Sequence, residues 1–126
     1  NAFIMAKGLI VDDDVDIRNA YAYALTHHGH EVSLASNSEE GLKVMQADPP
    51  DVMVLDLLMP GLSGVEFLRQ EKIRERYPNT KVLVFSNIDS PRVVSEANEL
   101  GIVEYIVKVS TTPSQMVEKI EKLTKE

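Results

Sequence analysis

The stretch VLDLLMPGLSG, residues 54–64, decides the fold of this chain. It begins inside an apolar run, residues 52–55, which ends at a single carboxylate, Asp56, before the chain turns through Met59, Pro60 and Gly61. Four consecutive apolar residues indicate a central strand of a parallel sheet, which is covered on both faces. An aspartate after a strand is often only a turn former, because its side chain accepts hydrogen bonds from nearby backbone amides. The other strands must therefore show whether Asp56 has a chemical role.

Similar apolar runs alternate with amphipathic stretches along the whole chain. The pattern predicts strands over residues 8–11, 31–35, 52–55, 81–85 and 103–107. It predicts helices over residues 14–28, 36–47, 63–77, 91–100 and from 113 onwards. Five strand–helix units in succession predict an α/β fold: a (βα)5, doubly wound, five-stranded parallel sheet with strand order 2-1-3-4-5. Residues 7–126 form one domain in this interpretation, and residues 1–6 are an N-terminal extension or a cloning remnant, with Met5 as a candidate native start.

Three of the predicted helix starts carry capping signals. Ser36 and Ser63 are each followed three residues later by a glutamate, which is the spacing of a capping box. Thr112 precedes a proline, which suits the first position of a helix. The predicted helix boundaries rest on these residues.

The composition excludes several classes of protein. With 126 residues, 44% of them hydrophobic, the chain has the size and composition of one soluble globular domain. The absence of cysteine excludes disulfides and thiolate metal sites, and it suits a reducing, cytoplasmic location. No apolar run approaches the roughly 18 residues of a membrane span, and the start is unlike a signal peptide. A net charge of −7 argues against direct binding of nucleic acid. The basic stretch at residues 69–81 also contains Glu71 and Glu75, so we interpret it as the solvated face of a helix and not as a phosphate-binding patch.

Carboxylates follow two strands that should be neighbours in this sheet. Asp12, Asp13 and Asp14 end the first strand, and Asp56 ends the third. In strand order 2-1-3 these ends meet at the point where the order reverses, which is where such sheets bind ligands. Clustered carboxylates repel one another unless a cation joins them, and oxygen ligands suit Mg²⁺. We therefore predict a magnesium site formed by Asp12, Asp13 and Asp56. Asp14 is expected to cap the following helix and not to bind the metal.

Two further strand ends bring suitable groups to the same edge. Lys108 follows the fifth strand and Ser86 follows the fourth. Alone, each would be an ordinary surface or turn residue. Together with a metal, an ammonium and a hydroxyl around Asp56 can neutralise a phosphoryl group while the carboxylate attacks it. This combination favours phosphoryl transfer to Asp56.

At this point the chain resembles the receiver domains of two-component response regulators, which have a flavodoxin-like fold. The resemblance extends from residue 7 to residue 125, and four segments carry it: LIVDDD (9–14), VLDLLMPGLSG (54–64), VLVFSN (82–87) and YIVK (105–108). It implies that Asp56 accepts a phosphoryl group from a histidine kinase or a phosphotransfer protein. It also implies that Mg²⁺ is held by Asp56, Asp12, Asp13 and the main-chain carbonyl of Leu58.

The resemblance implies a switch as well as a chemical site. Lys108 would pair with the phosphorylated aspartate, Ser86 would close on the phosphoryl oxygens, and Tyr105 would swing inward with it. The output surface would comprise the helix at 91–100, the strand at 103–107 and the last helix. Such a domain catalyses only its own phosphorylation and dephosphorylation, so it is a signalling module and not an enzyme with a separate substrate.

The expected partners follow from the same resemblance. They are a histidine kinase or phosphotransfer protein, and either a downstream protein or an output domain of a longer regulator; we expect no direct contact with nucleic acid or membrane. A phosphorylation-dependent homodimer remains open, as does the choice between a stand-alone receiver and a piece of a longer chain.

The sequence departs from the family pattern at four positions. Val109 stands where receivers usually have proline, often after a cis peptide bond; we expect a trans bond here, because a cis bond before a non-proline residue costs roughly 2.5–4 kcal/mol. Asn87 replaces a usually small residue and is large enough to cover part of the site. Leu58 and Ile88 are apolar where some receivers have groups that orient the hydrolytic water, which predicts a long-lived phosphoaspartate.

Other functions fit the residues less well. A degenerate receiver that binds partners without phosphorylation is the main alternative, and it rests on Val109 and Asn87. A haloacid-dehalogenase-like phosphatase usually has a second aspartate where Leu58 stands, and a flavodoxin-like carrier would meet three aspartates that repel the flavin phosphate. The histidines at 27, 28 and 30 surround a predicted helix end, and we interpret them as structural and not as metal ligands.

Overall fold

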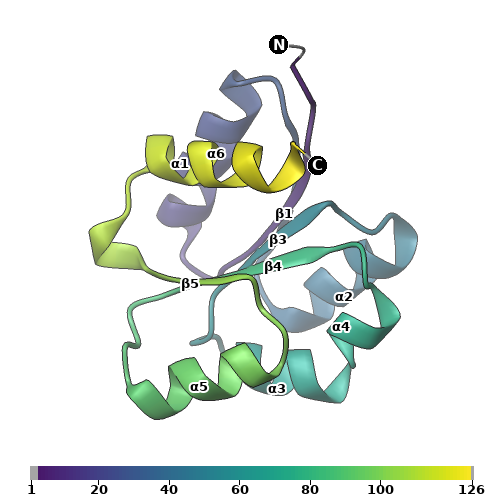
Figure 1. Ribbon diagram of the computed structural model, residues 1–126, viewed down its shortest axis with the longest axis vertical. Coiled ribbons are helices and arrows are strands. Elements are labelled where there is room, and N and C mark those ends of the chain that lie inside the picture. Colours follow the sequence, from purple (N-terminus) through teal and green to yellow (C-terminus); the bar gives the residue numbers. More distant parts are fainter. Residues whose placement is uncertain (1–2, 126) are drawn as a thin grey trace.

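Five strands form one parallel sheet in the computed structural model, which describes residues 3–125 (Figure 1). The strand order is β2-β1-β3-β4-β5, so the predicted fold and strand order are confirmed. The strands are β1 (Lys7–Val11), β2 (Glu31–Ala35), β3 (Val52–Leu55), β4 (Lys81–Ser86) and β5 (Glu104–Val107).

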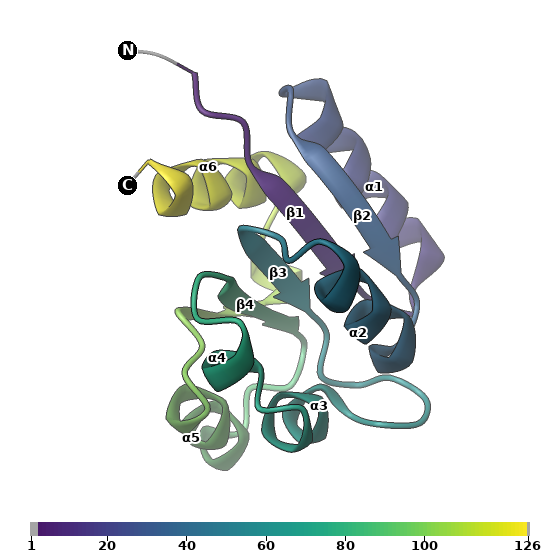
Figure 2. The same ribbon diagram turned by 90° about the vertical axis from the view of Figure 1, so that its right-hand side faces the viewer.

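Helices cover both faces of the sheet. The helices are α1 (Val15–His27), α2 (Ser38–Ala47), α3 (Gly64–Gln70), α4 (Ile73–Arg76), α5 (Pro91–Glu99), the short 3-10 helix η1 (Lys108–Ser110) and α6 (Pro113–Thr124). Helices α1 and α6 lie on one face and α2 to α5 on the other, as Figures 1 and 2 show from two sides. Parallel strands with helical crossovers produce this arrangement.

Strand β3 is buried on both faces, as its apolar run predicts. Val54 belongs to the hydrophobic cluster under α1 and α6, and its neighbour Leu55 belongs to the cluster under α2 to α5. Every side chain of β3 is at most 3% exposed. The backbone that precedes Asp56 is therefore held by packing on two sides.

The turn after β3 needs its glycines. Gly61 has φ +81°, a left-handed conformation that glycine adopts without strain. Gly64 lies so close to Asp56 that a β-carbon there would come within 2.6 Å of the Asp56 carbonyl oxygen. The loop consequently folds tightly back against the residue that ends β3.

The predicted helix over residues 63–77 is wrong, because the chain breaks between α3 and α4. Lys72 has φ +49° and ψ +50°, so it is left-handed and ends any continuous helix. Phe67 and Ile73 are both buried, but they are six residues apart, and a continuous helix from Phe67 would bring Arg74 inward at the seventh position. The break lets Ile73 enter the core and leaves Arg74 exposed.

The predicted start of the second helix is also wrong. The cap is Asn37, whose Oδ1 accepts the N–H of Glu40 over 2.9 Å, and α2 begins at Ser38. Ser36 lies before the helix and donates its N–H and hydroxyl to the Glu40 carboxylate, over 2.7 and 2.8 Å. The pairing with Glu39 fails because the asparagine occupies the extended position that a cap needs.

The other predicted caps are confirmed. Asp14, Ser63 and Thr112 cap α1, α3 and α6, and the last two form capping boxes. The remaining predicted ends of helices and strands lie within two residues of the observed ones.

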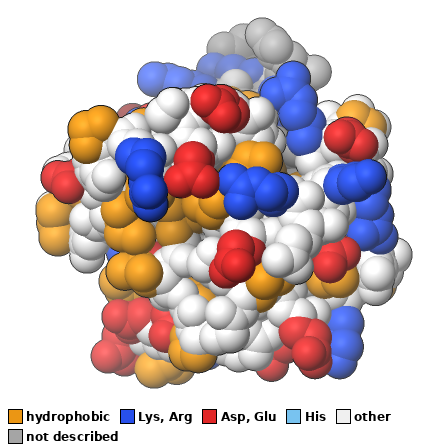
Figure 3. All heavy atoms as spheres, turned by 90° about the horizontal axis from the view of Figure 1, so that it is seen from below, with side chains coloured by type: hydrophobic (Ala, Val, Ile, Leu, Met, Phe, Trp, Pro, Cys, Tyr) orange, Lys and Arg blue, Asp and Glu red, His pale blue; other side chains and the backbone are white. Residues whose placement is uncertain are grey.

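The basic stretch at residues 69–81 is interleaved with acids. Arg69 Nη2 lies 3.0 Å from Oε2 of Glu96 on α5, and Arg76 Nη1 lies 3.1 Å from Oε1 of Glu71. Figure 3, which views the molecule from below Figure 1, shows basic and acidic side chains side by side on that face. These arginines therefore form ion pairs and not a continuous positive patch.

Candidate functional site

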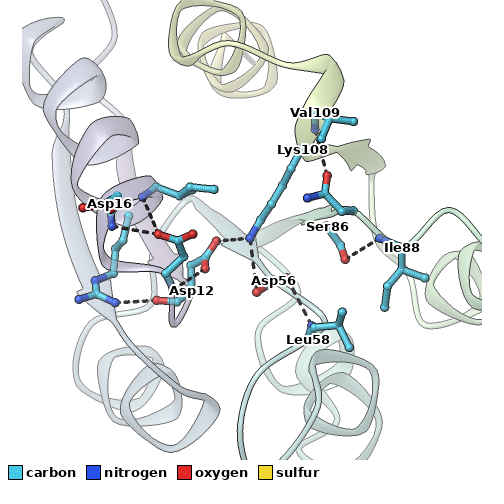
Figure 4. Close-up of polar contacts among 12 residues, drawn as sticks. Asp12, Asp16, Asp56, Leu58, Ser86, Ile88, Lys108 and Val109 are labelled. Carbon is cyan, nitrogen blue, oxygen red and sulfur yellow. Dashed lines mark hydrogen bonds and ion pairs between the residues drawn. The ribbon is translucent and has the colours of Figure 1, made fainter.

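Four strand ends meet at one edge of the sheet and supply the predicted site residues. Asp12 follows β1, Asp56 follows β3, Ser86 is the last residue of β4, and Lys108 follows β5. Both aspartates still donate their backbone N–H to the neighbouring strand, over 3.0 and 2.9 Å. The sheet thus positions both carboxylates, and Figure 4 shows Lys108 extending between them.

The three predicted metal ligands come together. Carboxylate oxygens of Asp12, Asp13 and Asp56 lie within 4.8 Å of one another. Asp12 and Asp56 are 1% and 5% exposed, and Asp13 faces solvent. Oδ1 of Asp12 accepts the N–H of Asp14 over 2.9 Å, which fixes the orientation of the carboxylate.

These oxygens fit a hard divalent cation. Oδ2 of Asp12 is buried, and the Lys108 ammonium lies 2.8 Å from it. A buried carboxylate is costly unless positive charge is paired with it, and a divalent cation bound here would add to the pairing that Lys108 provides. Three carboxylates at this separation, with no nitrogen or sulfur ligand, match the preference of Mg²⁺.

Lys108 is the cation of the site in this structure. Its Nζ lies 2.8 Å from Oδ2 of Asp12 and 3.4 Å from Oδ2 of Asp56, and also 5.6 Å from the centre of the Phe85 ring. Burial lowers the pKa of Lys108, but the hydrogen bond and charge of Asp12 and the charge of Asp56 outweigh burial and raise it. Lys108 is therefore protonated at neutral pH.

Burial dominates the ionisation of Asp56. The pKa of Asp56 is raised from 3.8 to about 6, and burial is the largest cause. Within this balance the Lys108 ammonium lowers the pKa, Asp12 raises it, and the N–H of Leu58, 3.3 Å from Oδ1, lowers it. The carboxylate is thus mainly ionised at neutral pH while it is largely shielded from water. Leu58 lies beside the site as predicted, and the role of its carbonyl as a ligand stays a prediction.

Ser86 and Tyr105 are joined through the backbone of Ile88. Ser86 is fully buried, and its Oγ accepts the N–H of Ile88 over 3.2 Å. The Tyr105 hydroxyl donates to the carbonyl of the same residue. Burial raises the pKa of Tyr105, and the Ser86 hydroxyl lowers it by a smaller amount. The two predicted switch residues therefore share one peptide segment.

The loop after Lys108 has a trans peptide bond, as expected, and forms η1. The N–H of Val109 donates to Oδ1 of Asn87 over 3.0 Å. The side chain of Val109 is 81% exposed. Asn87 is therefore tied to the Lys108 loop, a contact that the sequence did not reveal.

Two further residues near the site were not predicted from the sequence. Arg18 Nη1 donates to the carbonyl of Asp12 over 2.7 Å, and the Tyr21 hydroxyl donates to the carbonyl of Thr111 over 2.9 Å. Both residues lie on α1, one turn apart, and this spacing after the acidic run was the available signal.

The histidines lie away from the acidic cluster and make structural contacts. His28 Nδ1 lies 2.8 Å from the carbonyl of Ala24. His30 is buried just before β2, where Nδ1 accepts the N–H of Ala6 over 3.0 Å and Nε2 lies 2.8 Å from Oε2 of Glu121. His30 thus joins the segment before β1 to α6, a role that its position near a helix end does not suggest.

A family model described as the response regulator receiver domain matches residues 9–121. The chain belongs to this family. Receiver domains are signalling domains of two-component systems and not classical enzymes; they interact with histidine kinases and output domains, and they bind Mg²⁺ at a cluster of aspartates.

Individual relatives agree with this assignment. The receiver domain is 37% identical over 104 residues to the transcriptional regulatory protein AfsQ1 of Streptomyces coelicolor. This match covers 82% of this chain and 45% of that protein. It is 32% identical over 118 residues to the chemotaxis protein CheY of Thermotoga maritima. This match covers 93% of this chain and 96% of that protein. This receiver domain therefore spans less than half of AfsQ1 and nearly all of CheY.

Solved structures show the same fold. Chemotaxis protein CheY4 of Vibrio cholerae superposes with a TM-score of 0.85 at 29% identity, over 95% of this chain and 99% of that one. A CheY-like receiver from Methanospirillum hungatei gives 0.87 at 30% identity, over 95% and 94%. Among residues 3–125 of this receiver domain, no helix has both the length and the apolar character that a membrane crossing requires.

Proposed function

We propose that this receiver domain accepts a phosphoryl group on Asp56 from a histidine kinase or a phosphotransfer protein. The observation that carries the proposal is the convergence of Asp12 and the Lys108 ammonium on the buried Asp56 carboxylate, with Nζ 2.8 and 3.4 Å from the two carboxylates. A carboxylate in such surroundings is a positioned nucleophile, and the ammonium can neutralise the charge that it receives.

Asp56 would carry out the covalent step. One of its oxygens forms a bond to phosphorus while the bond between phosphorus and the donor's imidazole nitrogen breaks, and the imidazole keeps the electron pair of that bond. With a pKa of about 6, Asp56 is mainly ionised at neutral pH, so most molecules need not lose a proton before the attack. Its burial means that little water must be removed from the carboxylate first.

The neighbouring residues would hold the transferred group. Lys108 would neutralise a phosphoryl oxygen, and the Ser86 hydroxyl would donate a hydrogen bond to another. Asp12, Asp13 and Asp56, with the Leu58 carbonyl, would bind Mg²⁺, which supplies positive charge close to the phosphoryl oxygens.

Phosphorylation would then act on the Ile88 segment. A phosphoryl group attracts the Ser86 hydroxyl, whose Oγ now accepts the Ile88 N–H, and the Ile88 carbonyl accepts the Tyr105 hydroxyl. A change at this segment therefore reaches β5 through Tyr105 and shifts the balance between two packings of the α5–β5–α6 surface. A downstream protein, an output domain or a second copy of the chain would recognise that surface.

The proposal is tested by the intact mass of the protein after incubation with acetyl phosphate and Mg²⁺. We expect one added phosphoryl group in the wild type, and none without Mg²⁺ or in Asp56→Asn. If the folded wild type gains nothing, the site is inactive, and the domain is a degenerate receiver that binds partners constitutively.

A further inference from the structure

The loops that carry Ser86 and Lys108 are joined beyond the end of the sheet. The last ladder pair of β4 and β5 is Ser86 with Val107. Two residues past Val107, the N–H of Val109 donates to Oδ1 of Asn87 over 3.0 Å. Figure 4 labels the donor residue, Val109, next to Lys108. A side chain thus continues the connection between the two strands where the backbone ladder has stopped.

The bond depends on the residue types at both positions. Asn87 offers an amide oxygen as the acceptor, and Val109 offers a backbone N–H, which a proline would lack. The Val109 side chain is 81% exposed, so it contributes little packing. The part of Val109 that the fold uses is therefore its amide.

This amide belongs to the peptide group that directly follows Lys108. Holding that peptide fixes the point from which the flexible Lys108 side chain starts, and its Nζ must reach Oδ2 of both Asp12 and Asp56. The far side of the loop has its own anchors: Thr111 donates its N–H to the Lys108 carbonyl over 3.2 Å, and Tyr21 binds the Thr111 carbonyl. Asn87 is the anchor on the side of the Ser86 loop.

We propose that Asn87 is a positioning residue, which holds Lys108 in place through the Val109 amide and couples the Lys108 loop to the Ser86 loop. The inference rests on the proposed function, because Lys108 and Ser86 are the groups that would contact the phosphoryl group. Loss of the Asn87 acceptor loosens Lys108 without removing any group that touches the phosphoryl group.

The first test uses NMR of the metal-free, unphosphorylated protein to measure whether Asn87 holds the Val109 amide and the Lys108 ammonium in place. In Asn87→Ala we expect faster exchange of the Val109 amide and loss of the slowly exchanging Lys108 ammonium signal. Asn87→Asp keeps an acceptor oxygen and should restore protection of the amide. Val109→Ala keeps the N–H and removes only an exposed side chain, so its spectrum at residue 109 and at Lys108 should resemble the wild type. An unchanged amide and ammonium in Asn87→Ala would overturn the proposal.

The second test measures the rate of phosphorylation by acetyl phosphate with Mg²⁺. We expect Asn87→Ala to react about three- to tenfold more slowly, which matches the loss of one hydrogen bond, while Val109→Ala keeps the wild-type rate. The unfolding temperature of both variants should stay near that of the wild type. A wild-type rate in Asn87→Ala would overturn the positioning role. If the wild type itself is never phosphorylated, the proposed function fails, and the NMR result alone decides whether Asn87 positions Lys108.

Discussion

The Lys108 ammonium lies 2.8 Å from Oδ2 of Asp12, closer than its 3.4 Å separation from Oδ2 of Asp56. The lysine thus pairs first with the more deeply buried of the two carboxylates. Oδ2 of Asp12 is also buried, so a divalent cation that binds this oxygen would compete with the ammonium for it. Lysine and metal therefore oppose each other at Asp12.

Removing this ammonium should strengthen the binding of Mg²⁺. In Lys108→Met we expect the dissociation constant to fall about three- to tenfold, because a positive charge next to the ligands disappears. Lys43→Met is the matched control, since Lys43 is exposed and its loss changes the net charge equally. Isothermal titration calorimetry measures both constants. Equal affinity in the two variants would show that Lys108 does not compete with the metal.

The raised pKa of Asp56 predicts a specific dependence of stability on pH. The native state binds this proton more tightly, with a pKa of about 6, than the unfolded chain does at 3.8. The stability that protonation provides is therefore fully present below pH 3.8 and lost as the pH rises through 6.

Asp56→Asn lacks this titration. From about pH 4.5 to about pH 7.5 without metal, the free energy of unfolding of the wild type should fall by about 1–3 kcal/mol relative to the variant. Urea denaturation at both pH values provides the comparison. Parallel changes in the two proteins would contradict a raised pKa at Asp56.

The apolar residues beside the site predict slow loss of the phosphoryl group. Leu58 is 63% exposed and Ile88 is half-buried, and neither can orient an attacking water. The phosphorylated wild type should persist for minutes or longer after the donor is removed. Leu58→Asn should shorten its half-life at least about threefold, because a polar group can then position water. Leu34→Asn, an exposed leucine on β2, controls for the substitution; a wild-type half-life of seconds would refute the prediction.

The link between Tyr105 and Ile88 predicts a separation of chemistry from switching. Tyr105→Phe removes the hydroxyl that donates to the Ile88 carbonyl, but it leaves every proposed phosphoryl contact in place. We expect a near-normal rate of phosphorylation and smaller phosphorylation-induced NMR shifts on α6. Tyr23→Phe, at an exposed position on α1, should keep the full shifts. Full shifts in Tyr105→Phe would mean that the signal does not pass through this tyrosine.

The left-handed residue between α3 and α4 gives a prediction about stability. Lys72 adopts φ +49°, a left-handed conformation that is unfavourable for a residue with a β-carbon but not for glycine. Lys72→Gly should raise the free energy of unfolding by about 0.5–1 kcal/mol, whereas Lys72→Ala should not. Equal denaturation curves for the two variants would show that the turn is unstrained.

The sequence predicts much of this architecture because the site lies at strand ends. Parallel strands bring their carboxyl ends to one edge, so Asp12, Asp56, Ser86 and Lys108 could be placed together from the strand order alone. The break at Lys72 is not predicted by helical spacing alone, because that spacing continues the helix through residue 77. The six-residue gap between the buried Phe67 and Ile73 would have revealed it.

Contacts between loops could not be predicted in this way. The bond from Val109 to Asn87 joins residues 22 apart in two loops whose paths no periodicity describes. The burial of His30 depends on α6, which lies at the other end of the sequence. The preference of Lys108 for Asp12 over Asp56 is a matter of tenths of an ångström in side-chain position, which strand order does not determine.

The most direct test of phosphoryl transfer to Asp56 is to locate the phosphoryl group on the chain. The wild type is incubated with acetyl phosphate and Mg²⁺, the acyl phosphate is reduced with borohydride to homoserine, and the modified residue is identified by peptide mass spectrometry. We predict homoserine at residue 56 alone. Modification at Asp12 or Asp13, or an unmodified Asp56 in protein that has gained a phosphoryl group, would contradict it.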